Sequence, residues 1–390
     1  MPSRDPSLNL PEPPDELAAL SAQLCTRIVK EIEASGPMPL DRYLQLALYE
    51  DGLGYYVNGL HKFGASGDFV TAPEQGQLFA RCLARQIEAL PEAISQGTIL
   101  ELGAGSGALA AVLLNALEHP PKRYLILEPS AALREVQRER MAALPTDLVR
   151  RVEWISTLPD APLSGVILAN EILDALPVRA FQIEDGQVFE RCVTIEEDRL
   201  GWQLQPAPDR LQKAVRQLES ELNRPFPNGY TSEINLDLPA WLAGISASLQ
   251  TGLILLIDYG YPRHEYYHPD RADGTLVCHY RHRAHFDPFV WPGLTDLSTF
   301  VDFTAVAEAA CECGLNVTGF SSQAGFLMSL GIQELVVAEA DDQRRLALAG
   351  ELKRLVLPAE MGEKFKVIAL DRGLKAPLQG FALMDQLSRL

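Results

Sequence analysis

Apolar residues recur at every third or fourth position between residues 15 and 50, which is the period of an amphipathic helix. The Gly36-Pro37 pair interrupts this pattern, so it predicts two helices, and a third helix follows over about residues 78–90. Residues 52–76 are rich in glycine and aromatic residues and predict an irregular loop. We therefore expect a helical N-terminal cap over residues 16–95, which includes this loop, after a flexible, proline-rich segment 1–15.

Short apolar runs separated by helical stretches begin at Thr98. Four of these runs precede residue 171 and three follow residue 250: 98–102, 124–127, 152–155, 165–169, 252–257, 315–320 and 365–370. Strands that alternate with helices of this length form βαβ units and a parallel sheet. The pattern predicts an α/β fold with a seven-stranded, Rossmann-like sheet, built from residues 96–177 and 251–375.

Residues 178–250 interrupt this rhythm. Apolar and polar residues alternate up to about residue 206, which predicts antiparallel strands, and helical patterns follow over 211–222 and 236–249. We interpret residues 178–250 as an inserted α+β subdomain, which can serve as a substrate clamp or as the arm of a homodimer.

A glycine-rich loop, Glu101-Leu102-Gly103-Ala104-Gly105-Ser106-Gly107, joins the first strand of the sheet to a helix. Glycine lets the backbone turn tightly and lets a ligand approach, and the first turn of a helix offers free N–H groups. Gly103, Gly105 and Ala108 also satisfy the GxGxxG/A fingerprint of dinucleotide-binding folds. Glu101, Gly103, Gly105 and Gly107 are therefore candidate cofactor ligands, but the loop alone fits NAD and S-adenosylmethionine equally well.

Glu128 ends the second strand of the sheet and is a candidate ligand of a ribose, because a carboxylate at this place can accept both ribose hydroxyl groups. Either cofactor contains such a ribose. The segment after the fourth strand indicates which of the two cofactors is bound. Its sequence is Ala169-Asn170-Glu171-Ile172-Leu173-Asp174. Its carboxylates could orient an amine or a guanidinium for methyl transfer, whereas hydride transfer needs a proton donor near a carbonyl, and no Tyr-x-x-x-Lys pattern occurs in the sequence. S-adenosyl-L-methionine is therefore the favoured cofactor, with Asn170 beside it.

Six short strings of residues resemble motifs of a known family. They are Leu53-Gly54-Tyr55-Tyr56, Gly67–Glu74, Asn170–Pro177, Ile257-Asp258-Tyr259-Gly260, Val301-Asp302-Phe303 and Met361–Lys366. In these strings, and in the order of its strands, the chain resembles the class I S-adenosylmethionine-dependent methyltransferases. It is most similar to the family of the mitochondrial complex I assembly factor methyltransferase and its bacterial relatives, over roughly residues 36–372. Ala72 stands where the family usually has serine, a small change that we expect to be silent.

The resemblance implies a protein methyltransferase that acts on arginine, since the mitochondrial member is associated with symmetric arginine dimethylation of a respiratory complex I subunit. We expect the Gly67–Glu74 string to fold over the methionine end of the cofactor, with Asp68 and Thr71 as hydrogen-bonding groups. We expect Glu171, Asp174 and Glu233 to form an acidic catalytic pocket, because paired carboxylates suit the planar guanidinium group. Two alternatives stay open: methylation of a small molecule, and a cofactor-binding assembly chaperone with little catalysis.

Composition limits the partners of the protein. Its net charge of −18 over 390 residues disfavours general binding to nucleic acid and favours a protein substrate with a basic side chain. The longest apolar runs have about five residues, too few to span a membrane.

We expect a cytoplasmic protein with no disulfide scaffold. The six cysteines are scattered without CxxC spacing, and the proline-rich start shows no targeting pattern. Five histidines lie in residues 261–300, where prolines predict a loop over the substrate rather than a metal site.

Overall fold

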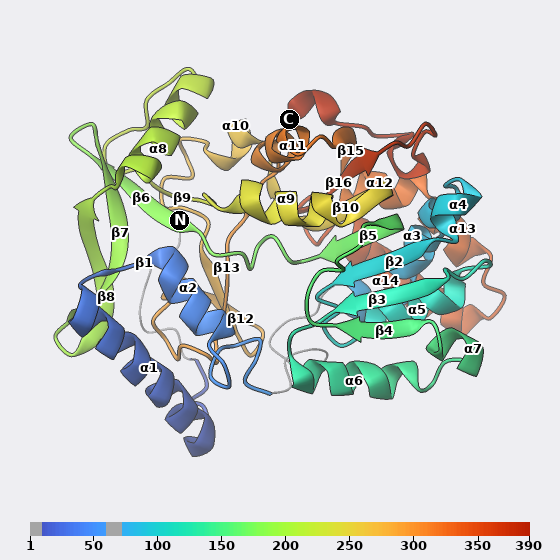
Figure 1. The fold of residues 1–390 in the computed structure, drawn as a ribbon, viewed down its shortest axis with the longest axis horizontal. Coiled ribbons are helices and arrows are strands. Elements are labelled where there is room, and N and C mark those ends of the chain that lie inside the picture. The colour runs from blue at the N-terminus through green and yellow to red at the C-terminus, as the bar shows by residue number, and fades with distance from the viewer. Residues whose placement is uncertain (1–9, 60–71) are drawn as a thin grey trace. The chain divides into compact units, whose positions relative to one another are not determined.

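The computed structural model describes residues 10–59 and 72–390, which form two compact units (Figure 1). The first unit contains the described residues of Met1–Phe69 together with Asp174–Asp237 and Arg263–Phe300. The second contains the described residues of Val70–Leu173 together with Leu238–Pro262 and Val301–Leu390. The division into a flexible start, a cap, a core and an insertion, with the boundaries given above, stays a prediction.

A twisted, largely parallel sheet is the framework of the second unit. Its path runs through seven strands in the order β15 (Asn316–Ser322), β16 (Phe365–Arg372), β10 (Leu249–Tyr261), β5 (Leu163–Asn170), β2 (Thr98–Leu102), β3 (Arg123–Leu127) and β4 (Val152–Ile155). The short strand β14 (Val301–Asp302) also pairs with β10. β16 is antiparallel to both of its neighbours, whereas β10, β5, β2, β3 and β4 pair in parallel. All seven predicted strands are present, so the prediction of a seven-stranded α/β sheet is confirmed.

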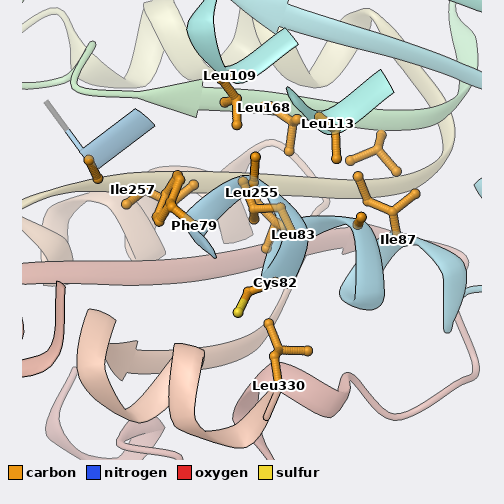
Figure 2. Packing of buried hydrophobic residues seen from close by; sticks show 14 of the residues in the cluster. Phe79, Cys82, Leu83, Ile87, Leu109, Leu113, Leu168, Leu255, Ile257 and Leu330 are labelled. Carbon is orange, nitrogen blue, oxygen red and sulfur yellow. The ribbon is translucent and has the colours of Figure 1, made fainter. Parts of the chain in front are cut away.

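Helices cover this sheet because its central strands are apolar on both faces. Leu253 to Ile257 in β10 are each at most 1% exposed. Figure 2 shows one face, where Leu255 and Ile257 of β10 and Leu168 of β5 meet side chains of two helices. The helices of the second unit are α3 (Leu78–Glu88), α4 (Glu92–Ser95), α5 (Ala108–Ala116), α6 (Ala131–Met141), α7 (Thr146–Val149), α9 (Leu238–Ala247), α11 (Phe303–Glu312), α12 (Gln323–Ser329), α13 (Ile332–Val337) and α14 (Asp342–Val356). Our sequence interpretation assigned no element between residues 320 and 365, where α12 to α14 lie.

An antiparallel sheet organises the first unit. Its strands are β1 (Met38–Pro39), β7 (Gln187–Glu196), β6 (Arg179–Glu184) and β9 (Thr231–Ile234), in this order, and β8 (Arg199–Pro206) pairs with β7. The helices α1 (Asp15–Ser35), α2 (Leu40–Tyr49), α8 (Asp209–Glu221) and α10 (Arg263–Tyr266) belong to the same unit. The antiparallel strands predicted for residues 178–206 are therefore present.

Residues 261–300 are more regular than the sequence indicates. They contain a three-stranded antiparallel sheet of β12 (Arg283–His285), β11 (Val277–Tyr280) and β13 (Asp296–Ser298), where we predicted a loop. Strands of three or four residues are too short to show a convincing alternation of apolar and polar residues. His285 is only 1% exposed, so one of the polar residues that favoured a loop lies inside the unit.

Two glycines hold the centre of the parallel sheet together. A Cβ atom at Gly252 would lie 1.9 Å from the carbonyl oxygen of Gly165, and one at Gly165 would lie 1.9 Å from that of Thr98. The backbones of β10, β5 and β2 therefore approach each other at a place where no side chain fits. This close approach fixes the register of the strands at whose ends the candidate site lies.

We expect Gly252→Ala to lower the free energy of unfolding by about 3 kcal/mol, because a backbone oxygen has to move to admit the new methyl group. Gly244→Ala is the matched control. Gly244 lies inside α9, and its added Cβ would meet Leu158 at an ordinary 3.7 Å. That substitution should stabilise the helix by about 0.5–1 kcal/mol. Thermal unfolding of the two variants measures both effects, and equal melting temperatures would contradict this account of the sheet.

Candidate functional site

The loop between β2 and α5 turns through three glycines in the left-handed region. Gly103, Gly105 and Gly107 have φ values of 61°, 53° and 80°. Other residues adopt this conformation only at a cost, so the glycines explain why this short loop can form. Gly107 stands at the N-terminal end of α5 and has no side chain to cap it. The first N–H groups of α5 are therefore available to a bound molecule.

Three side chains tie this loop to the segment that precedes α3. The Ser106 hydroxyl group donates a hydrogen bond to the carboxylate of Glu74, in the 3₁₀ turn Ala72–Gln75. Arg140 of α6 donates to Ser106 Oγ over 2.8 Å and forms an ion pair of 3.4 Å with Glu74. The contact places the end of the Gly67–Glu74 string against the glycine loop. Asp68 and Thr71, which we expect to contact the cofactor, lie outside the described residues.

Glu128 lies directly after β3 and is 4% exposed. Its Oε1 accepts the N–H of Ser130 at 3.0 Å, and its Oε2 accepts the amide of Gln137 at 3.1 Å. A carboxylate accepts about four hydrogen bonds. The place of Glu128 directly after β3 is one at which a carboxylate can bind the hydroxyl groups of a ribose.

Gln137 is a residue of this site that the sequence interpretation missed. It is fully buried on α6, and its Nε2 donates both to Glu128 and to the carbonyl oxygen of Gly105, the latter at 2.9 Å. Its Oε1 accepts the indole N–H of Trp154 at 2.9 Å. One amide therefore connects the glycine loop, the candidate ribose ligand and β4. No motif marks it, because a glutamine on a helix is usually exposed.

Glu101 is the buried acid at the start of the glycine loop. It is 3% exposed and accepts a hydrogen bond of 2.7 Å from the hydroxyl group of Tyr124. Burial raises the pKa of Glu101 to about 7, the Tyr124 hydrogen bond lowers it in part, and the charge of Glu128 raises it further. Glu101 is the last but one residue of β2, and its side chain contacts β3 through Tyr124, so its contact with a cofactor stays a prediction.

The segment after β5 holds the candidate acceptor ligand. Asn170 is the last residue of β5, and its Nδ2 donates to Glu171 Oε1 over 2.9 Å. Glu171 has a φ of 55°, a left-handed conformation that glutamate rarely adopts. The next two N–H groups, of Ile172 and Leu173, donate to the carboxylate of Asp258 on β10 at 3.1 and 2.9 Å. Asn170 and Glu171 thus lie at the carboxyl end of a central strand, where ligands bind in open parallel sheets.

The other two candidate catalytic carboxylates belong to the first unit. Asp174 is 6% exposed, and its carbonyl oxygen accepts the N–H of Thr299. Glu233 lies on β9 and is 3% exposed. It accepts both the N–H and the hydroxyl group of Thr275, at 2.8 and 2.9 Å. Burial raises its pKa, and these hydrogen bonds lower it in part. The acidic pocket expected from Glu171, Asp174 and Glu233 stays a prediction.

Comparison with known proteins identifies the family. Residues 78–321 match the family model described as "Putative S-adenosyl-L-methionine-dependent methyltransferase", which is more than half of the chain. The chain belongs to this methyltransferase family. It is 27% identical to the mitochondrial protein arginine methyltransferase NDUFAF7 homolog of Drosophila melanogaster, over 98% of this chain and 93% of that protein.

Two solved structures from Burkholderia thailandensis are similar along the same length. Each is 39% identical to this chain and covers 98% of it, and the alignment takes in 100% of each of those chains. The first has a TM-score of 0.91 and holds bound S-adenosyl-homocysteine, and the second, a native crystal structure, has a TM-score of 0.89. These comparisons confirm the class I methyltransferase fold, and they show a methyltransferase whose cofactor is S-adenosyl-L-methionine.

The residues of the second unit fit this cofactor. Among the described residues, the buried Oδ1 of Asn170 has no hydrogen-bond partner, so it can accept one from a ligand amine. Glu128 can accept the ribose hydroxyl groups, and the glycine loop can approach the ligand through its backbone. When bound, the cofactor supplies a methyl group on a positively charged sulfur atom.

The site needs no metal for this chemistry, and no group of three metal-binding side chains occurs in residues 10–59 and 72–390. No helix in these same ranges is long and apolar enough to cross a membrane.

The shifted pKa of Glu101 predicts a pH dependence of stability. Its pKa in the folded protein, about 7, exceeds its ordinary value of 4.5. The folded state therefore holds a proton that the unfolded state releases, and stability is lost as pH rises through about 7. Relative to Glu101→Gln, the ligand-free protein should lose about 3 kcal/mol of unfolding free energy between pH 4 and 8. Urea unfolding at successive pH values measures the difference. Tyr124→Phe should move the loss to higher pH, and a difference that does not change with pH would contradict the assignment.

The position of Gln137 predicts an effect on cofactor affinity. Gln137→Leu removes the amide that holds Glu128 and the Gly105 carbonyl, so we expect the Kd for S-adenosyl-homocysteine to rise about tenfold, since an orienting hydrogen bond to a charged group contributes about 1.5 kcal/mol. Glu139→Leu, at an exposed position of the same helix, is the control and should leave the Kd unchanged. Calorimetric titration gives both values. Equal affinities for the two variants would exclude Gln137 from the site.

Proposed function

We propose that the protein transfers methyl groups to an arginine side chain of a protein substrate, and that this substrate is a subunit of respiratory complex I. Relatives that match nearly the whole chain are named protein arginine methyltransferases, including those of Drosophila melanogaster and Danio rerio. The net charge of −18 favours the approach of a basic substrate. The cytoplasmic location and the homodimer expected from the sequence stay predictions.

The observation that carries this proposal is the position of Glu171. Its carboxylate accepts a hydrogen bond from Asn170 and stands directly after β5, beside the loop that fits the cofactor. A guanidinium group is charged at physiological pH and donates hydrogen bonds in a planar fork that matches a carboxylate. In our proposal Glu171 orients this group so that one of its nitrogen atoms faces the methyl group. That nitrogen would bond to the methyl carbon as the carbon–sulfur bond breaks, and the sulfur would keep the electron pair and leave as S-adenosyl-homocysteine. The nitrogen would release its proton to water, and the carboxylate of Glu171 would stabilise the positive charge.

Asp174 and Glu233 complete the proposed acidic pocket. Both Asp174 and Glu233 are buried, and Glu233 is held by Thr275 in one orientation. A buried carboxylate whose hydrogen bonds are already made loses little freedom when a cation binds. We propose that these two groups are further catalytic carboxylates of the methyl transfer.

The test is methyl transfer from labelled S-adenosyl-L-methionine to isolated complex I, to arginine peptides and to small amines. We expect label in methylated arginine, identified by mass spectrometry after hydrolysis. Glu171→Gln should lower kcat at least 100-fold, because a charge-assisted contact of the transition state is lost, and should change the Kd for S-adenosyl-homocysteine less than threefold.

Asp160→Asn, which changes an exposed carboxylate after β4, is the control and should keep full activity. Label on small amines alone would replace our proposal with small-molecule methylation. Assembly of complex I that proceeds equally with Glu171→Gln, without labelled arginine, would indicate a chaperone.

A further inference from the structure

We propose that Asp258 is a positioning residue for the methyl transfer, because its carboxylate holds Glu171 in the conformation in which it meets the acceptor. This inference rests on the proposed function of Glu171. It adds a residue on a different strand, which acts through Glu171, to the groups on which the reaction depends.

The backbone of Glu171 is the first observation. Seven other described residues besides glycine have a positive φ: Asp185, Glu197, Asp198, Asn223, Arg281, His282 and Trp291. Six of these are exposed, and several lie in hairpin turns, such as Asp185 between β6 and β7. Glu171 instead follows a buried central strand of the parallel sheet. A left-handed glutamate is unfavourable and persists only where its surroundings impose it.

The surroundings that impose this conformation are two successive residues of β10. The N–H of Glu171 donates to the carbonyl oxygen of Ile257 at 2.9 Å, which continues the ladder between β5 and β10. The N–H groups of Ile172 and Leu173 then donate to one oxygen of Asp258. The strand pairing between β5 and β10 therefore ends at Glu171, and Asp258 binds the backbone from the next residue, Ile172.

Asp258 is itself fixed. It is fully buried, and its second carboxylate oxygen accepts the N–H of Tyr259 at 2.9 Å. A buried carboxylate that accepts backbone N–H groups forms strong, charge-assisted hydrogen bonds. The geometry is comparable to that of a helix cap, but the segment that it holds is the turn that carries Glu171.

The same turn contacts the glycine loop. A Cβ atom at Gly103 would lie 2.4 Å from Cδ1 of Ile172, so the loop lies directly against the residue after Glu171. A shift of this turn would therefore change the distance between the cofactor loop and the carboxylate of Glu171. Asp258 sets this distance because it binds the backbone N–H groups of Ile172 and Leu173.

The experiment compares Asp258→Asn and Asp258→Ala with Asp371→Asn. Asp371 is a matched control, because it is 1% exposed, ends a strand of the same sheet and accepts the N–H of Leu374 at 3.0 Å. It lies at the opposite edge of the sheet, where it pairs with Leu253. We expect Asp258→Asn to lower kcat at least tenfold, with KM and the Kd for S-adenosyl-homocysteine within threefold of the wild type. Asp371→Asn should lower the melting temperature but change kcat less than twofold.

A double-variant cycle tests whether Asp258 acts through Glu171. In a Glu171→Gln background, Asp258→Asn should lower kcat no further, because the group that it positions is already lost. An equal loss of kcat in both backgrounds, or an unchanged kcat in the single variant, would overturn the proposal. Should Asp258→Ala fail to fold, Asp258→Asn retains the shape of the side chain and still decides the question.

Unfolding measurements separate this inference from the proposed function. Glu171→Gly should raise the melting temperature by about 2 °C in the wild type, because glycine accepts the left-handed conformation, and by less in Asp258→Asn, where the turn can relax. Asp185→Gly should raise it in both backgrounds. This result is independent of the acceptor, so a failure to methylate arginine would refute the proposed function alone. A lower melting temperature for Glu171→Gly would overturn the inference.

Discussion

The pairing of β5 with β2 on one side and with β10 on the other is the constraint on which the site of the second unit depends. In this register Ala169 pairs with Leu102 and Asn170 with Ile257. The glycine loop follows β2, the Glu171 turn follows β5, and Asp258 follows the last residue of β10 that pairs with β5, so all three lie at one edge of the sheet. A slip of one residue would reverse the direction of each side chain. The glycines at positions 165 and 252 prevent such a slip, because they allow a backbone approach that no other residue permits there.

Burial gives the carboxylates around this edge different properties according to the hydrogen bonds they receive. Glu101 accepts one bond from a tyrosine, and its pKa rises to about 7. Glu128 accepts a backbone N–H and an amide. Asp258 accepts three backbone N–H groups. Burial and a single tyrosine hydrogen bond thus place the pKa of Glu101 near neutral pH.

The sequence allowed the sheet to be predicted strand by strand, because runs of Leu, Ile and Val separated by helical spacing leave few other folds. The glycine loop and Glu128 could be predicted for the same reason, since their positions follow from the ends of strands. The roles of Gln137 and Asp258 could not. Each depends on a hydrogen bond to backbone atoms far away in the sequence, and a sequence pattern contains no record of such a bond. The short strands within residues 277–298 could not be predicted, because a strand of three or four residues is too short to show an alternation of apolar and polar positions.

The antiparallel strand β16 has a consequence for how the protein is made. It fills the place between β10 and β15, although it is the last strand of the sheet to be synthesised. Until residues 365–372 have left the ribosome, the edge of β10 that pairs with β16 has no partner there, and its N–H and C=O groups are open to other chains. Contacts between segments so far apart also form slowly. β10 and β15 both pair with β16, so both lack a neighbouring strand until then, and chaperone demand should fall once β16 has emerged.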